Sequence, residues 1–253
     1  MNNSKPIAIV TGGSRGLGRS TVLALAQRGV RSIFTYHTNA AEAAKVVALT
    51  RDAGTEGVAL QLDTGSVAAF DGFVARVRET LGSLGAARFD ILVNNAGTSH
   101  DQLIERTTET ELDELYNVHF KGVFFLTQKL LSLLNDGGRI VNLSTGLTRF
   151  AHPGRASYAS MKGAIEVLTR YMAKELGPRG IAVNAVAPGA IATDFSGGVV
   201  RDNAEVNQAV AGNTALGRVG QPDDIGPMIA SLVSAENRWV NGQRIEVSGG
   251  MSL

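Results

Sequence analysis

The sequence predicts an α/β fold in which helices cover both faces of one doubly wound, parallel sheet. Short apolar runs alternate with amphipathic helical patterns along the whole chain, as they do when each strand is followed by a crossover helix. Most of the apolar runs are continuous, which is typical of strands covered on both faces. No repeat, linker or change in composition divides residues 1–253. We therefore expect a single domain that spans the chain.

Composition excludes several classes of function. The hydrophobic share is 44%, the charged share 19% and the net charge +1, and no basic block could follow nucleic-acid phosphates or an anionic membrane. The chain has no cysteine and its four histidines show no metal-ligand spacing, so we expect no metal site. No stretch approaches the roughly 20 apolar residues of a membrane helix, and the N-terminus lacks signal-peptide character. We expect a cytoplasmic protein with no nucleic-acid or membrane partner.

The first predicted strand, residues 6–10, runs into a glycine-rich turn and then into a helix. Glycines let a backbone approach a pyrophosphate closely, and the free N–H groups of the following helix favour anions. Gly12, Gly16 and Gly18 are spaced Gly-x-x-x-Gly-x-Gly, which differs from the Gly-x-Gly-x-x-Gly dinucleotide fingerprint. On spacing alone, the segment could be a phosphate site or only a tight turn.

The end of the second predicted strand bears on which dinucleotide would bind. An acidic residue at this place would bind the ribose 2′-hydroxyl of NAD. Here the strand ends at Tyr36, His37 and Thr38 follow, and no carboxylate comes before Glu42. Arg15, in the glycine turn, could pair with a 2′-phosphate. These residues favour NADP over NAD, although Arg15 could simply be solvated.

The remaining elements follow from hydrophobic periodicity and length. Asn117 is out of place in the long helix expected at 110–135, because asparagine competes for backbone hydrogen bonds. It could kink that helix and hold a water. The other helices are expected at 40–53, 67–81, 157–176 and 222–234, and the strands at 32–36, 58–62, 91–93, 140–143, 181–187 and 244–247.

Two strand ends carry polar or small residues. Asp63 could accept a hydrogen bond from an adenine amine or cap the helix that follows it. Asn-Asn-Ala-Gly at 94–97 fits the wall of a cofactor site, and Asn94 could equally brace neighbouring strands. Farther along, the chain turns small and polar at about 194 and then helical to about Gly212. A segment of this kind, about 194–215, could be a mobile lid over a site or an inert surface excursion.

Residues 144–162 carry the most specific chemistry. Tyr158 and Lys162 are four positions apart, so on a helix their side chains share one face. A tyrosine phenol titrates near about pH 10, and a neighbouring ammonium lowers that pKa. Such a phenol can give a proton to a carbonyl oxygen or take one from an alcohol, and the hydroxyl of Ser144 or Thr145 could hold that oxygen. Alone, the pair could also be an ordinary surface pair.

Together these segments resemble the short-chain dehydrogenase/reductase family over nearly the whole chain. Each segment is weak by itself, but all of them occur in order at the family's usual intervals. The resemblance implies a Rossmann-like fold and an NAD(P)-dependent oxidoreductase. The matching segments are TGGSRGLG from Thr11, Asp63, NNAG from Asn94, Asn117, the hydroxyl pair before YASMK, and PGAIAT from Pro188.

The resemblance also implies roles for individual residues. Tyr158 would be the proton donor and acceptor, Lys162 would lower its pKa and bind the nicotinamide ribose, and Asn117 would hold a water that extends the proton relay. Ser144 and Thr145 complete the catalytic candidates. Besides Tyr158 and Lys162, the residues expected at the cofactor are Gly12, Ser14, Arg15, Gly16, Leu17, Gly18, Tyr36, His37, Thr38, Asp63, Thr64, Asn94, Ala96, Gly97, Pro188, Gly189, Ile191 and Thr193.

One position departs from the family pattern. The substrate-orienting serine usually lies thirteen positions before the tyrosine, and counting back from Tyr158 gives Thr145. A threonine hydroxyl can make the same hydrogen bond. We therefore expect Thr145 to orient the substrate, with Ser144 as the alternative if the loop holds a one-residue insertion.

The expected activity is NADPH-dependent reduction of a ketone or aldehyde, reversible as an alcohol dehydrogenase. One alternative is a 3-oxoacyl-(acyl-carrier-protein) reductase, which would need a basic patch for its acidic partner; another is a non-catalytic NADP(H) sensor. Two long helices have more apolar surface than a sheet face needs, so we expect a homotetramer or homodimer with the C-terminus near a subunit boundary. Residues expected near the substrate are His100, Leu147, Arg149, His152 and Phe195.

Overall fold

Seven parallel strands form one sheet in the computed structural model, in the order β3-β2-β1-β4-β5-β6-β7. The structure describes residues 5–253, and residues 1–4 of the expected domain lie outside this part. The chain leaves the centre first toward β3 and later toward β7, so the order reverses between β1 and β4, where ligands of such sheets bind. The strands are β1 (Ile7–Val10), β2 (Arg31–Tyr36), β3 (Gly57–Gln61), β4 (Phe89–Asn94), β5 (Leu134–Leu143), β6 (Ala182–Pro188) and β7 (Arg244–Val247).

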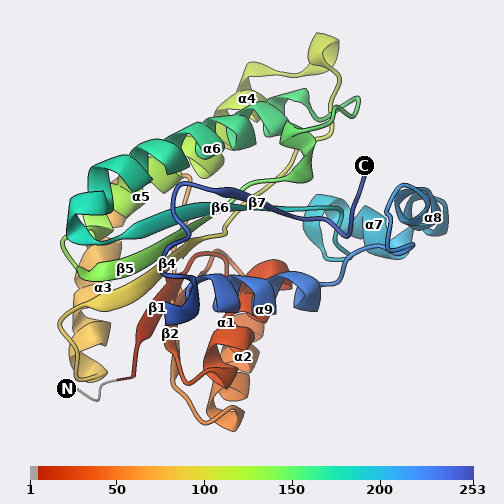
Figure 1. The fold of residues 1–253 in the computed structure, drawn as a ribbon. Helices are drawn as coiled ribbons and strands as arrows, with labels where there is room; N and C mark the ends of the chain where they lie inside the picture. The colour runs from red at the N-terminus through yellow and green to blue at the C-terminus, as the bar shows by residue number, and fades with distance from the viewer. Residues whose placement is uncertain (1–4) are drawn as a thin grey trace.

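Helices cover both faces of this sheet, which confirms the predicted fold class (Figure 1). One face carries α1 (Gly16–Gln27), α2 (Ala40–Asp52) and α9 (Pro222–Leu232). The other face carries α3 (Phe70–Ser83), α5 (Gly122–Leu130) and α6 (Ala156–Leu176). Three shorter helices are α4 (Glu109–Tyr116), α7 (Val199–Asp202) and α8 (Ala204–Gly212). No helix within residues 5–253 is long and apolar enough to cross a membrane.

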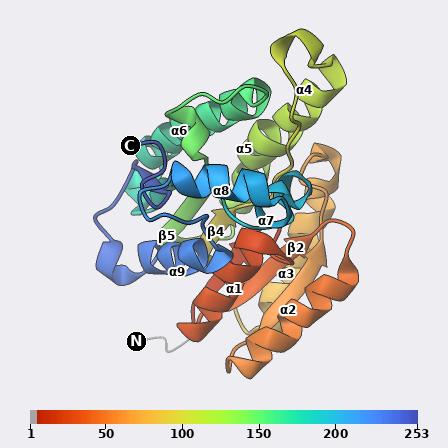
Figure 2. The same cartoon turned by 90° about the vertical axis from the view of Figure 1, so that its right-hand side faces the viewer.

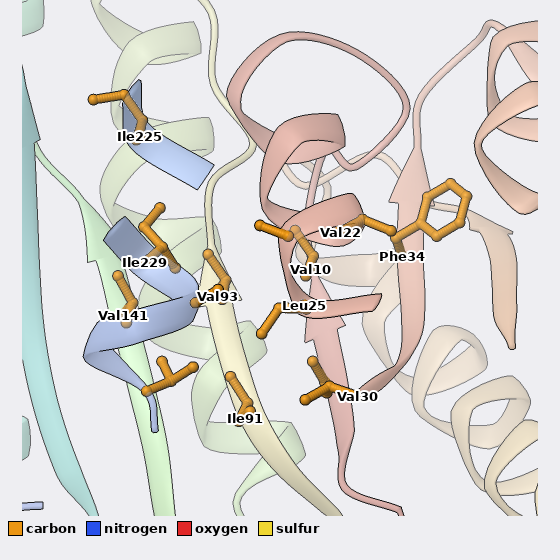
Figure 3. Packing of buried hydrophobic residues seen from close by; sticks show 14 of the residues in the cluster. Val10, Val22, Leu25, Val30, Phe34, Ile91, Val93, Val141, Ile225 and Ile229 are labelled. Atoms are coloured by element: carbon orange, nitrogen blue, oxygen red, sulfur yellow. The ribbon is translucent and has the colours of Figure 1, made fainter. Parts of the chain in front are cut away.

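Each face of the sheet has its own apolar core. On one face, Leu25 of α1 and Ile229 of α9 pack over Val10 and Val93 of the central strands (Figure 3). On the other face, Phe73 of α3 belongs to the second core and is fully buried. Because both faces are covered, the strands read as continuous apolar runs rather than as alternating ones.

The prediction of one long helix at 110–135 is wrong. The structure has α4, a turn of π-helix at Asn117–Lys121, and then α5, which ends at Leu130. Leu134, counted with that helix in the sequence, already begins β5 and is buried in the sheet core. An apolar leucine run fits a buried strand as well as a helix, so periodicity alone did not show the boundary.

The loops that follow β1, β4, β5 and β6 all leave the same edge of the parallel sheet. In Figure 2, α7 and α8 lie in front of the sheet, and they are the helices that the chain forms after β6. These two helices fall inside the segment 194–215. The predicted site residues therefore meet at one edge, beneath a helical excursion.

Candidate active site

Tyr158 and Lys162 lie in the first turns of α6, over the end of β5. Both side chains are buried, with exposed fractions of 8% and 5%. The Lys162 Nζ donates a hydrogen bond to the Leu143 carbonyl at 2.6 Å and lies 5.7 Å from the centroid of the Tyr158 ring. The two side chains thus share a helix face, and both face the protein interior.

Burial sets the protonation state of this pair. It raises the pKa of Tyr158, although the Arg155 charge and a hydrogen bond with the Thr145 hydroxyl act in the opposite direction. Burial also lowers the pKa of Lys162 to about 7. The lowering of the phenol pKa that was expected from Lys162 is not found: the groups that lower it are Arg155 and Thr145, and desolvation outweighs both. At neutral pH, Tyr158 is a neutral phenol, which is the form that donates a proton.

The two neighbouring hydroxyls point to different partners. Ser144 Oγ donates a hydrogen bond to Glu166 Oε1 at 2.6 Å. Glu166 Oε1 also accepts from Arg244 Nε at 2.8 Å, so the Ser144 hydroxyl belongs to a charged network beside the site. The Thr145 hydroxyl instead lies beside the phenol of Tyr158, where it acts to lower the pKa of that group. Of the two candidates, the structure therefore brings Thr145 to the reactive side chain.

His119 is a site residue that the sequence analysis did not single out. Its ring is 1% exposed and stands edge-on to the Tyr158 ring, with centroids 5.2 Å apart and planes at 83°. Asn117 is only half-buried, and its side chain makes no hydrogen bond within residues 5–253. A π turn holds one residue more than an α-helical turn. The regular α-helical spacing therefore does not show which residue of this turn faces the site. The only sequence signal was Asn117 itself, which marked the irregularity without showing its result.

The glycine turn after β1 has the shape that a pyrophosphate needs. Gly12 has φ +66, and a Cβ on Gly18 would lie 2.1 Å from the Gly12 carbonyl oxygen, so no other residue fits there. Asn95 Nδ2 holds the turn through the carbonyl of Thr11 at 2.8 Å. No side chain caps the N-terminus of α1 behind it, which leaves the first N–H groups open to an anion. The turn therefore fits a dinucleotide phosphate.

Among the residues expected at the adenosine end, Asp63 is the one that carries a carboxylate. Asp63 is exposed and accepts a hydrogen bond from the Gly65 N–H at 2.8 Å. Arg15 is exposed and forms no ion pair among the described residues, and His37 and Thr38 are exposed beyond the half-buried Tyr36. This set of donors fits a 2′-phosphate better than a bare ribose hydroxyl.

Asn94 acts as a brace between strands. Its Nδ2 donates to Asn142 Oδ1 at 2.8 Å and to Thr127 Oγ1 at 3.1 Å, and Asn142 donates in turn to Thr169. Of the two roles left open by the sequence, the structure shows this one.

The other predicted cofactor residues are distributed around the same edge. The Ala96 N–H donates to Thr11 Oγ1 at 3.0 Å. A Cβ on Gly97 would lie 2.7 Å from Cε1 of His119, and one on Gly16 would lie 3.6 Å from Cγ2 of Thr193. The remaining residues lie at the ends of strands and in the segments that follow them. Ser14 is buried, Leu17 borders the first core and Thr64 packs on Gly122. Pro188 ends β6, Gly189 packs on Ser248 and Ile191 pairs with Gly220.

Known proteins with the same architecture share much of this sequence. The family model described as Enoyl-(Acyl carrier protein) reductase matches residues 12–252. A 3-oxoacyl-[acyl-carrier-protein] reductase of Staphylococcus aureus is 37% identical over 248 residues, which are 97% of this chain and 98% of that protein.

Two solved structures are also similar along nearly their whole length. The promiscuous reductase LugOII, which catalyses keto-reduction at C1 during lugdunomycin biosynthesis, is 37% identical with a TM-score of 0.94, and the match covers 100% of both chains. A short chain dehydrogenase of Burkholderia cenocepacia in complex with NADP is 35% identical with a TM-score of 0.89, over 98% and 99% of the two chains.

The chain belongs to the short-chain dehydrogenase/reductase family. The resemblance seen in the sequence is thereby confirmed. This short-chain dehydrogenase/reductase is an oxidoreductase that acts on CH–OH or carbonyl groups.

The start of the segment after β6 lies against the site residues of this short-chain dehydrogenase/reductase. The ring of Phe195 lies 5.8 Å from that of Tyr158. The Ser196 hydroxyl lies 2.8 Å from that of Ser99 and accepts from Arg155 Nη1 at 3.1 Å. These contacts tie the start of the segment to the loops that follow β4 and β5.

Three of the residues expected near the substrate are held elsewhere. Arg149 pairs with Glu246 at 2.7 Å, and its guanidinium also donates to backbone carbonyls near the C-terminus. His100 lies 2.9 Å from Glu114, and the His152 ring contacts the Pro153 carbonyl. Of these five residues, Phe195 lies against the Tyr158 ring. Within residues 5–253, no three or more His, Cys, Asp or Glu side chains gather in a way that could hold a metal ion.

The buried lysine predicts a specific pH dependence of stability. The pKa of Lys162 is about 7 in the folded protein and near roughly 10.4 in the unfolded chain. Between these values the unfolded chain binds more protons, so the free energy of unfolding rises with pH, by up to about 1.4 kcal/mol per pH unit from this residue, and falls again as pH drops toward 7.

In Lys162→Met, the free energy of unfolding should rise less steeply with pH, because the contribution of this lysine is removed. Denaturant unfolding without cofactor at about pH 7, 8 and 9 measures it, with Lys174→Met, on the exposed side of α6, as the matched control that keeps the slope. Equal slopes for wild type and Lys162→Met would contradict the assigned burial of the charge.

Proposed function

We propose that this protein is an NADP(H)-dependent reductase of a ketone or aldehyde, with Tyr158 as general acid and, in reverse, general base. The observation that carries the proposal is a buried, neutral phenol held between Thr145 and Lys162 at the sheet edge that also bears the glycine turn. A phenol in a dry site beside a hydride donor is suited to protonate a developing alkoxide.

The residues divide the work of reduction. NADPH, when bound, supplies the hydride to the carbonyl carbon. Thr145 and Tyr158 donate hydrogen bonds to the carbonyl oxygen and hold it in place, and Tyr158 gives its proton to that oxygen as the C=O bond becomes C–OH. Lys162 stabilises the phenolate that remains. General acid catalysis of this kind contributes roughly 10²- to 10⁴-fold to the rate.

The choice of NADP rests on charge at the adenosine end. Arg15 is exposed and without an ion pair in residues 5–253, and no carboxylate follows Tyr36 before Glu42. A similar short chain dehydrogenase, of Burkholderia cenocepacia, was solved with NADP. NAD is the less suitable cofactor, because its ribose hydroxyls would find no carboxylate there.

Reduction of 3-oxoacyl groups on an acyl carrier protein is a second candidate, favoured by the similarity to the Staphylococcus aureus reductase. An acidic carrier needs a basic surface near the site. Lys129, the one basic residue expected for this purpose at the end of α5, pairs with Asp71 at 2.6 Å. That pairing leaves simple carbonyl compounds as the preferred substrates.

We also propose that a second copy of the chain covers the outer face of α5 and α6. A groove of about 540 Å³ runs between these helices. Three apolar side chains along it, Phe124, Val167 and Tyr171, are 37%, 46% and 64% exposed. Two such faces can pair across a two-fold axis and extend to a tetramer. Leu253 is 96% exposed, which leaves the C-terminus free to reach a subunit boundary.

The experiment that tests the proposed function is a rate measurement. Oxidation of NADPH and of NADH is followed against a panel of ketones, aldehydes, quinones and 3-oxoacyl esters. The proposal expects carbonyl-dependent turnover with a higher kcat/KM for NADPH. Binding of NADPH without turnover of any carbonyl would favour a cofactor sensor instead, and selective turnover of the 3-oxoacyl esters would favour the second candidate.

The contrast between the two hydroxyls yields a prediction about kcat. Thr145→Val removes the hydroxyl at the phenol and should lower kcat by about tenfold or more. Ser144→Ala removes a bond to Glu166 and should leave kcat within about a factor of three, with a loss of stability of about 1 kcal/mol. Steady-state kinetics and thermal unfolding of both variants check this, and the reverse ranking of the kcat values would overturn the assignment.

A charge placed in the groove tests the proposed association. Val167→Asp should break the association through this face, because a carboxylate would be buried at the centre of the contact. A dimer would then become monomers of 26.5 kDa, and a tetramer would fall to half its mass. Light scattering after size-exclusion chromatography measures the mass, with Ile104→Asp, at a side chain that is 80% exposed and outside the groove, as the control. A monomeric wild-type protein would contradict the proposal.

A further inference from the structure

His119 carries an acceptor that the rest of the described site leaves without a partner. Its Nε2 lies 2.7 Å from the Thr98 carbonyl oxygen and 3.3 Å from the Thr98 backbone nitrogen. The carbonyl oxygen can only accept and is the nearer atom, so we assign the proton to Nε2. In the neutral ring the lone pair is then on Nδ1. That atom is buried and has no hydrogen-bond partner within residues 5–253. A buried polar atom of this kind calls for a water or ligand group.

The surroundings keep this ring neutral. Burial lowers the pKa of His119 well below its usual value, and the positive charge of Lys162 lowers it further, while the Thr98 carbonyl acts in the opposite direction. The imidazole and the ammonium flank the same ring: the His119 centroid lies 5.2 Å, and the Lys162 Nζ 5.7 Å, from the centroid of the Tyr158 ring. The Nδ1 atom of His119 is thus a neutral, fixed hydrogen-bond acceptor, as an amide oxygen would be. It lies next to Tyr158 and Lys162, the two residues that exchange protons.

We propose that His119, and not Asn117, completes the proton relay: its bare Nδ1 accepts a hydrogen bond from a water that links Lys162 to solvent. This inference rests on the proposed reductase function and adds the path of the second proton. When Tyr158 has given its proton to the substrate oxygen, Lys162 returns a proton to the phenolate. The water gives a proton to Lys162 and takes one from bulk water, so that one proton enters for each carbonyl reduced.

The geometry explains why the relay is assigned to this residue. Thr98 fixes the ring from the loop after β4, the Tyr158 ring lies against it, and Gly97 leaves room for it, because a Cβ there would lie 2.7 Å from Cε1. Asn117 shares the same π turn, but it is only half-buried, and no hydrogen bond within residues 5–253 joins its amide to Tyr158 or Lys162. His119 is therefore a positioning residue that acts through the water and Lys162.

A matched pair of variants tests the relay. His119→Gln keeps a donor for Thr98 and an acceptor in place of Nδ1, whereas His119→Met has a similar length and no hydrogen-bonding group to offer. With a ketone found in the panel, His119→Met should lose about tenfold or more in kcat, with KM for the ketone and the Kd of NADPH within about threefold of wild type. His119→Gln should recover most of the lost kcat.

Asn117→Ala separates the two candidate positions. A relay through Asn117 requires a loss of kcat in Asn117→Ala, whereas the relay through His119 keeps most of it. Equal kcat values for His119→Met and wild type, or an equal loss in the folded His119→Gln and His119→Met, would overturn the inference while the reductase function stands. If His119→Met fails to fold, the kcat of His119→Gln against that of Asn117→Ala decides. A wild type that reduces no carbonyl removes the proposed function itself.

Discussion

Removal of Tyr158 and Lys162 from water is the constraint on which the site depends. A buried lysine at a pKa of about 7 and a buried phenol of raised pKa oppose folding unless their polar atoms have partners. The Leu143 carbonyl and the Thr145 hydroxyl provide them. Both partners come from the end of β5, so the chemistry requires α6 to lie directly over that strand end.

The surrounding structure fixes this arrangement from several sides. Glu166, two turns along α6 from Tyr158, accepts hydrogen bonds from Ser144 and from Arg244 of β7. The loop that presents Thr145 is thereby tied to both α6 and β7, through an ion pair with exposed fractions of only 14% and 24%. On the other side, the Asn94–Asn142 amide pair joins β4 to β5. Such interior polar networks stabilise one geometry because leaving any member unpaired is costly.

The features that could be predicted from the sequence are those that depend on the spacing of residues within one strand or one helix. Alternating strands and helices predicted the sheet, and the spacing of Tyr158 and Lys162 predicted a shared face because α6 is a regular helix. Ser144 and Thr145 were not separable, because adjacent residues of an extended chain point to opposite sides and the sequence does not show which side faces the site. His119 was missed because the π turn at Asn117–Lys121 changes the count of residues per turn.

The central claim is that the Tyr158 phenol supplies the proton to the substrate oxygen. The most direct measurement compares Tyr158→Phe with wild type on the best substrate, together with the Kd for NADPH. The change removes one oxygen and keeps the ring that contacts His119 and Phe195. We predict a fall in kcat of at least about 10²-fold with the Kd within about threefold. A Tyr158→Phe variant that binds NADPH and turns over at a wild-type rate would contradict the account.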